Sequence, residues 1–148
     1  MKKLITLSLC LFSVLSYSQR VMIEAGPTFF KDYAVGINAG ITGIIAKTAT
    51  SGVGIGAEVY KSADLPIGFP IFVRGVMVAK SGLILNLSAG YMIMNEEYDD
   101  GKLNYGGLYS KLGVGYATKH IYGLFQFNGA TILKEFKPGI SLSIGARF

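Results

Sequence analysis

Few side chains in this sequence have the chemistry of a catalytic residue. His120 is the only histidine, and Cys10 is the only cysteine. A general base must lie within hydrogen-bond reach of the group that it deprotonates, and nothing in the pattern around His120 places a serine or a carboxylate there. Zinc needs several nitrogen or sulfur ligands, which these residues do not supply. The sequence therefore predicts no catalytic residue, no metal centre of this kind and no cofactor.

A second group of side chains that could bind a ligand is the acidic cluster formed by Glu96, Glu97, Asp99 and Asp100. Carboxylate oxygens are the ligands that calcium and magnesium prefer, but the spacing is not that of an EF-hand loop. Contact with a cation or with another surface is one interpretation of this predicted loop. A solvated acidic loop is the simpler one.

Two glycine-rich segments, 52–56 and 113–115, invite comparison with phosphate-binding loops. Neither continues as G-x-G-x-x-G or ends in Gly-Lys-Ser/Thr. They are better explained as glycines within strands, where they leave room for large neighbouring side chains such as Tyr60, Tyr109 and Tyr122.

The N-terminus has the features of a secretory signal peptide. Two lysines precede a short apolar run at 4–15, and Ser16 and Ser18 place small residues at a cleavage site. An uncleaved anchor helix would need about 20 apolar residues, and this run is shorter. We expect a signal peptide at 1–18 and one mature domain at 19–148.

The composition favours a single domain in an apolar environment. The chain has 148 residues, of which 51% are hydrophobic and 16% are charged. These proportions are apolar for a soluble protein of this size. The formal net charge of +5 is small and includes two lysines of the predicted signal peptide, so nucleic acid is not an expected partner.

The mature sequence alternates between bulky apolar residues and small or polar ones. Leu85, Leu87 and Ala89, for example, are separated by Asn86 and Ser88. A period of two is the pattern of β-strands, and no mature segment has the 18 or so uninterrupted apolar residues of a transmembrane helix. The sequence predicts an all-β, up-and-down antiparallel barrel with eight strands, at 20–30, 34–45, 52–62, 70–79, 83–94, 103–116, 120–129 and 139–148.

Periodicity alone does not say which face of the strands points outward, and a soluble barrel with a buried apolar face is the rival. The interior of an eight-stranded barrel cannot hold four or five large apolar side chains from every strand. We therefore expect the apolar face to meet lipid. Buried charges are tolerable only when they are paired, and this register points two acids and three bases inward as a structural network: Glu24, Glu58, Arg74, Lys111 and Arg147.

Aromatic residues near the predicted strand ends are typical of the girdle that membrane barrels carry at the bilayer interfaces. Ordinary strand propensity is the alternative explanation. The residues concerned are Phe29, Phe30, Tyr60, Phe69, Tyr91, Tyr105, Tyr116 and Phe148.

The last predicted strand places Ile140, Leu142, Ile144, Ala146 and Phe148 on one face and ends in phenylalanine. It resembles the C-terminal assembly signal of outer-membrane proteins. The mature chain as a whole resembles the small OmpA/OmpX-type barrel family, without a peptidoglycan-binding domain. The resemblance implies insertion into the outer membrane of a Gram-negative-type bacterium by the barrel-assembly machinery, with lipid and lipopolysaccharide as partners.

The longer predicted connections, at 63–69, 95–102 and 130–138, alternate with short turns, as external loops of membrane barrels do. We expect a monomeric, non-enzymatic protein whose structural or adhesive role is carried by these loops. Three alternatives remain open: a narrow porin-like pore for ions or small solutes, a lipid-modifying enzyme, and a soluble periplasmic binding barrel.

Overall fold

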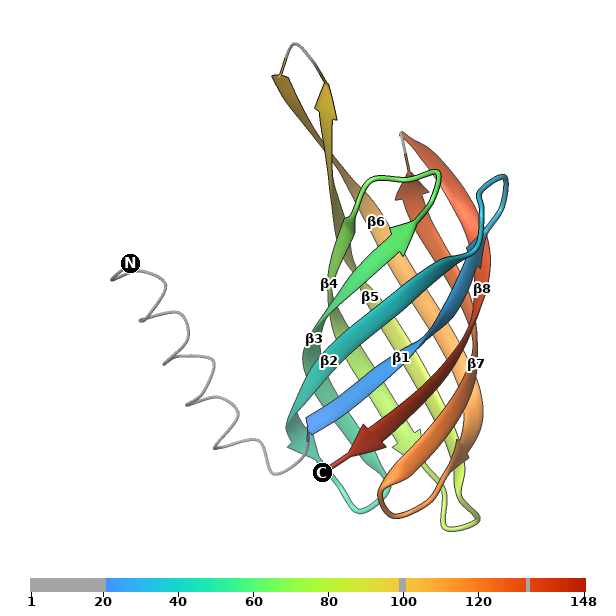
Figure 1. Cartoon of the computed structure of the whole chain (residues 1–148). Helices are drawn as coiled ribbons and strands as arrows, with labels where there is room; N and C mark the ends of the chain where they lie inside the picture. The colour runs from blue at the N-terminus through green and yellow to red at the C-terminus, as the bar shows by residue number, and fades with distance from the viewer. Residues whose placement is uncertain (1–20, 99–100, 133) are drawn as a thin grey trace.

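The protein is a closed β-barrel (Figure 1). Its structure is a computed structural model that describes residues 21–98, 101–132 and 134–148. The predicted signal peptide, 1–18, lies outside the described residues. The strands are β1 (Val21–Phe30), β2 (Gly36–Lys47), β3 (Ser51–Ser62), β4 (Gly68–Val78), β5 (Leu83–Tyr98), β6 (Gly101–Ala117), β7 (Ile121–Ile132) and β8 (Glu135–Arg147).

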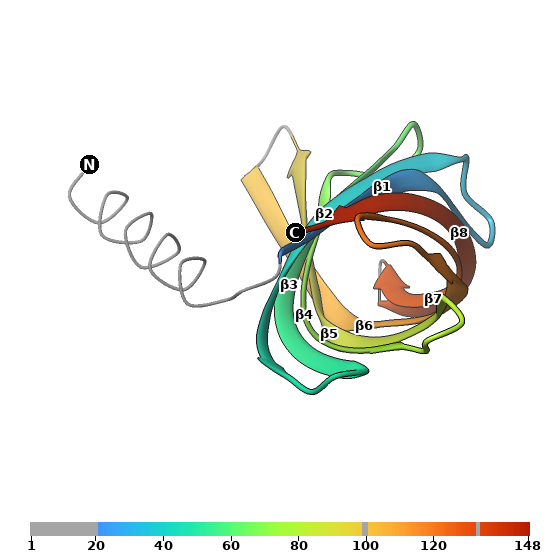
Figure 2. The same ribbon diagram turned by 90° about the horizontal axis from the view of Figure 1, so that it is seen from below.

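Each strand pairs antiparallel with its neighbour in the sequence, and β1 pairs with β8 to close the sheet. Figure 2 shows this closure in a view along the barrel. Closure leaves no unpaired edge around the barrel wall, so the backbone hydrogen-bonding groups of the wall are satisfied within the sheet. The predicted all-β, eight-stranded, up-and-down barrel is confirmed.

The two faces of the strands differ as the alternation predicts. Along β5, Leu85 and Leu87 are exposed, whereas Asn86 and Ser88 are buried. The outer face carries an apolar belt that every strand contributes to, and the inner face carries most of the buried polar and charged side chains. The described residues include no helix that is long and apolar enough to cross a membrane.

The predictions of long loops at 95–102 and 130–138 are wrong, because most of each segment belongs to paired strands. β5 and β6 continue as a paired hairpin to Tyr98 and Gly101, and this hairpin rises well beyond the rest of the barrel (Figure 1). β7 and β8 likewise stay paired to Ile132 and Glu135. Charged, glycine and proline residues made both segments resemble loops, but antiparallel neighbours can extend a ladder with one another beyond the barrel rim. The connection at 63–67 is a loop, as predicted.

The two ends of the barrel are different. Both termini of the barrel domain lie at one end (Figure 1), together with the short turns at 48–50, 79–82 and 118–120. The connections at 31–35 and 63–67 and the β5–β6 hairpin lie at the other end. Gly82 has a φ of 91° and sits under the ring of Tyr116, so a side chain there would be strained and would clash.

Candidate functional site

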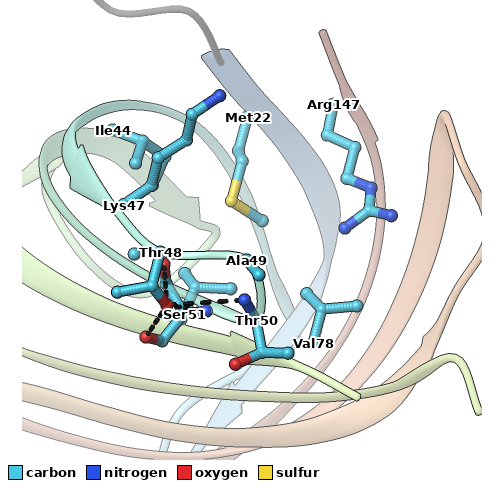
Figure 3. Close-up of a pocket in the computed structure, with 11 residues that line it drawn as sticks. Met22, Ile44, Lys47, Thr48, Ala49, Thr50, Ser51, Val78 and Arg147 are labelled. Carbon is cyan, nitrogen blue, oxygen red and sulfur yellow. Dashed lines mark hydrogen bonds between the residues drawn. The ribbon is translucent and has the colours of Figure 1, made fainter. Parts of the chain in front are cut away.

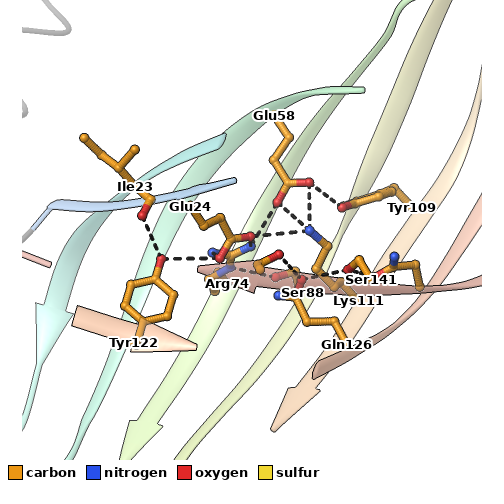
Figure 4. Close-up of polar contacts among 12 residues, drawn as sticks. Ile23, Glu24, Glu58, Arg74, Ser88, Tyr109, Lys111, Tyr122, Gln126 and Ser141 are labelled. Carbon is orange, nitrogen blue, oxygen red and sulfur yellow. Dashed lines mark hydrogen bonds and ion pairs between the residues drawn. The ribbon is translucent and has the colours of Figure 1, made fainter. Parts of the chain in front are cut away.

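Four charged side chains meet inside the barrel (Figure 4). Glu24 comes from β1, Glu58 from β3, Arg74 from β4 and Lys111 from β6, and each is at most 4% exposed. The structure thus brings together four of the five residues that the sequence placed in an inward network. We call these four residues the charge cluster.

Arg74 bridges the two carboxylates of the charge cluster. Its Nη1 and Nη2 donate to the two carboxylate oxygens of Glu24, at 3.0 and 2.8 Å. Nη2 also donates to Oε1 of Glu58 at 3.1 Å, and Nε donates to Oγ of Ser88 at 2.9 Å. The planar guanidinium therefore binds both carboxylates. Its contact with Glu24 is bidentate, with two parallel hydrogen bonds that a lysine could not make.

Lys111 completes the charge cluster from the other side. Its ammonium donates to both oxygens of Glu58 at 2.8 Å and to Oε1 of Glu24 at 3.4 Å. The hydroxyl of Tyr109 donates to Oε2 of Glu58 at 2.7 Å. Two carboxylates thus face two cations, so the charge cluster is electrically balanced, which is the condition for burying charges at tolerable cost.

The strand register explains how residues far apart in the sequence meet. Glu24 is paired with Gly40 of β2, and Gly40 is paired with Glu58 of β3, so the two acids share one row. Arg74, Ser88 and Lys111 share a second row across β4, β5 and β6. A Cβ atom at Gly40 would clash with Cγ of Glu58. The glycine therefore gives the Glu58 side chain the space through which it reaches the bases.

Placing Arg74 inside also puts Phe72 and Val76 of the same strand inside, and both are buried. The guanidinium carbon of Arg74 lies 4.7 Å from the centre of the Phe72 ring, which is a cation–π distance. Gly56 leaves the space that this ring occupies. Phe72 thus packs against the buried guanidinium of the charge cluster.

The charge cluster blocks the lumen. Side chains from β1, β3, β4 and β6 meet in it, and Ser88 of β5 accepts a hydrogen bond from Arg74. Tyr122 of β7 donates to the carbonyl of Ile23 at 3.2 Å and to Glu24 at 3.4 Å. On the side of the hairpin end lies a cavity of about 10 Å³, lined in part by Tyr60, Met92 and Tyr109. Such a space holds no more than about one water molecule. The arrangement fits a structural cross-link better than a solute path.

Arg147 is not part of the charge cluster. On β1, Glu24 pairs with Gly145 and Met22 pairs with Arg147, so the arginine lies nearer the end that carries the termini. There it borders a cavity of about 50 Å³ with Met22 and Lys47 (Figure 3). Its Nε donates to the carbonyl of Lys119 at 3.2 Å. The face was predicted correctly, but the height along the barrel axis was not.

The other residues singled out in the sequence lie apart from the charge cluster. His120 lies in the 118–120 turn and borders a surface pocket with Lys119, Arg147 and Phe148. Glu96 and Glu97 belong to β5 instead of a loop, and Asp99 and Asp100 lie outside the described residues. Within the described part of the chain, no group of three or more histidine, cysteine or acidic residues is arranged to hold a metal ion.

The apolar face of the last strand points outward. Ile140, Leu142, Ile144 and Phe148 are exposed and Ala146 is half-buried, on a strand that pairs with both β7 and β1. The proposed aromatic girdle needs a correction, because Phe30 and Tyr60 point into the barrel. Their rings form an edge-to-face pair with centres 5.2 Å apart. Phe29, Phe69, Tyr91, Tyr116 and Phe148 do point outward, and the side chain of Tyr105 lies outside the part that the structure describes.

Solved structures of membrane barrels share this architecture. The N-terminal β-barrel domain of Pseudomonas aeruginosa OprF is 18% identical, with a TM-score of 0.59 over 88% of this chain and 98% of that one. Neisserial surface protein A is 16% identical, with a TM-score of 0.60 over 86% and 94%. The chain has the fold of the small outer-membrane barrels. Ail, the attachment invasion locus protein of Yersinia pestis, is 15% identical, with a TM-score of 0.52 over 87% and 96%. No protein-family model and no curated protein sequence matches the chain.

Some members of the inner network of this barrel could not be found from residue type alone. Ser88 bonds Arg74, and Ser141 and Ser143 each donate to Oε1 of Gln126 at 2.9 Å. Alternation places all of them on the inner face. Which of them reach one another depends on the stagger between strands, and that stagger is fixed by closure of the barrel and not by any local signal.

Proposed function

We propose that this chain is an integral outer-membrane β-barrel protein without enzymatic activity, whose structural or adhesive role is carried by its external end. The observation that carries the proposal is the apolar belt. Exposed leucine, isoleucine, valine and phenylalanine side chains surround the whole barrel, and Leu87, Leu108 and Ile144 are 61%, 69% and 73% exposed. Water-exposed apolar surface of this extent is unfavourable, whereas a bilayer covers it.

The fold suggests an orientation in that membrane. Outer-membrane barrels place their short turns in the periplasm, so the end with both termini would face the periplasm and the β5–β6 hairpin the outside. In this proposal, residues 1–18 direct export and the last strand is recognised by the barrel-assembly machinery. Outer-membrane lipid and lipopolysaccharide surround the belt. Because the closed wall offers no edge for a second copy, we propose a monomer.

The external end offers the surface for a contact. The backbone N–H of Ala34 donates to Asp64 at 2.7 Å, and Oγ of Ser62 donates to the carbonyl of Ala34 at 3.1 Å. The connections at 31–35 and 63–67 are thereby tied together. Leu65 of the second connection is buried in the mouth of the barrel. Beside this tied platform stands the β5–β6 hairpin, and Ail, a protein of similar fold that has been solved with a heparin analogue, is named for attachment.

The rival functions are less well supported. A narrow pore would need the charge cluster to open, so we expect the protein to give no steady conductance in planar bilayers. A lipid-modifying enzyme would need a catalytic group near the outer leaflet, whereas His120 lies at the opposite end. A comparison of lipid A composition with and without the protein tests the enzyme directly.

The membrane assignment is tested by cell fractionation followed by gel electrophoresis with and without boiling. We expect the protein in the membrane fraction, with a mobility that changes on heating because the folded barrel resists detergent. A protein found in the soluble fraction with one heat-insensitive band would refute the proposal.

The external role is tested with cells that produce the protein or a variant in which a two-residue turn replaces residues 96–103. Attachment is measured on glass and on heparin-coated surfaces, and heat-dependent mobility confirms that the variant barrel folds. We expect the wild-type protein to increase attachment and the shortened hairpin to reduce that gain. Equal attachment by producing and non-producing cells would contradict an adhesive role and leave a structural one.

A further inference from the structure

The barrel end that carries both termini has a ring of basic side chains. Lys47 ends β2, Lys80 lies in the 79–82 turn and Lys119 lies in the 118–120 turn, and all three are exposed. None of the nine acidic residues of the chain falls in or next to these turns. Arg147 adds a fourth cation at this end. We call the three lysines the lysine ring.

The opposite end carries charges of both signs that pair with one another. Lys137 lies 3.2 Å from Oδ2 of Asp32 and 2.7 Å from Oε2 of Glu135. Asp64 is also at this end, on the 63–67 connection. The excess of lysine over acidic side chains is therefore a property of one end of the barrel and does not follow from a general excess of lysine on the surface.

The lysine ring lies at the border of the apolar belt. Each lysine is within three residues of exposed apolar side chains that end the belt, namely Ile45, Met77, Leu83, Tyr116 and Ile121. At about 3.3 Å per residue this separation is roughly 10 Å or less. The polar headgroup region begins at the edge of the hydrocarbon core and is several ångströms thick, and a lysine side chain can reach into it from this border.

We propose that the lysine ring binds the phosphate groups of anionic phospholipids in the membrane leaflet that faces the periplasm. This inference rests on the proposed membrane location. The three lysines come from three different turns, so each can contact a different lipid. An ammonium at an anionic membrane surface favours the charged lipid by about fivefold. No acidic side chain at this end competes for the ammonium groups.

The test uses the protein folded into phosphatidylcholine vesicles that contain a trace of spin-labelled lipid. The fraction of label immobilised at the barrel surface gives the association of phosphatidylglycerol relative to phosphatidylcholine, whichever way the barrel is oriented. We expect a preference of about twofold or more for phosphatidylglycerol, because strong contacts at the lysines are averaged with contacts elsewhere. The preference should fall in 1 M salt, where the screening length is about 3 Å.

The decisive variant is K47Q/K80Q/K119Q, and its matched control is K31Q/K61Q/K134Q, which removes the same charge from the other end. We expect the first to lower the preference to about one and the control to retain it. A wild-type preference of one, or an equal fall in both variants, would overturn the inference and leave the membrane assignment intact. If neither label is immobilised at all, the barrel is not in the bilayer and the proposed function itself fails.

Discussion

Replacing Arg74 by methionine should be among the most damaging single changes in this barrel. The substitution removes four hydrogen bonds, two to Glu24, one to Glu58 and one to Ser88. It leaves two buried carboxylates with one cation between them, the ammonium of Lys111. Breaking a buried ion pair by removing one partner costs about 3–5 kcal/mol, because the other charge remains buried without compensation. We expect a loss of that size in the free energy of unfolding.

The double variant E24Q/R74M separates charge imbalance from lost packing. It retains one carboxylate, Glu58, with the Lys111 ammonium 2.8 Å from both of its oxygens. The amide introduced at position 24 keeps Tyr122 as a neighbour, since that hydroxyl lies 3.4 Å from the native carboxylate. Because balance is restored, the double variant should be more stable than R74M alone. The coupling energy between the two sites should be about 2 kcal/mol or more.

Urea unfolding in lipid vesicles measures these differences. The chain has no tryptophan, so circular dichroism and gel mobility report the folded fraction. K31M serves as the control, because it removes an exposed charge and should change stability by less than about 0.5 kcal/mol. A cost below about 1 kcal/mol for R74M, or a double variant no more stable than R74M, would refute the idea that charge balance holds the lumen together.

Three further changes test other parts of the structure by the same unfolding measurement. Gly40→Val should cost about 1–3 kcal/mol because its side chain takes the space of Glu58, whereas Ala39→Val, on the outer face of the same strand, should be neutral. Leu112→Lys adds a charge to the apolar belt at the level of the charge cluster and should cost about 2–4 kcal/mol in a bilayer, while Leu112→Phe should not. Leu65→Ala should cost about 2–5 kcal/mol because it empties part of the buried external mouth, and an unchanged midpoint would show that this loop does not seal it.

Much of the fold could be predicted from the sequence because one signal was repeated in every strand. Alternation identified eight strands and both faces, and it placed Glu24 and Arg74 inside. The positions at which the strands end were predicted less well. Residues beyond the barrel rim, such as those that extend β5 to Tyr98, are charged and polar, yet they still pair with the neighbouring strand. Local polarity does not distinguish a hairpin in water from a loop.

For the candidate site, the sequence predicts the face of the strand on which a residue lies but not the height of that residue along the barrel axis. Period two gives the face of Arg147 and of Glu58, but not how far each lies along the axis. That height depends on the stagger accumulated around the closed sheet, which a single strand does not encode. Phe30 and Tyr60 were misassigned for a related reason. Their position near strand ends suggested a girdle, whereas the phase of the alternation in their own strands already places them inside.

A membrane barrel cannot use hydrophobicity in the usual way to decide which face of a strand points inward. Its outer face must be apolar to meet lipid, so a strand with apolar residues on both faces would have no preferred phase, and a slip by one residue would cost little. The charge cluster removes this ambiguity. In the proposed membrane location, a slip of β1 or β4 by one residue would carry Glu24 or Arg74 into hydrocarbon, where each is unpaired and costly. We infer that the cluster specifies register as well as stability, and that variants which neutralise it in full should fold more slowly or into mixed registers even where they regain stability.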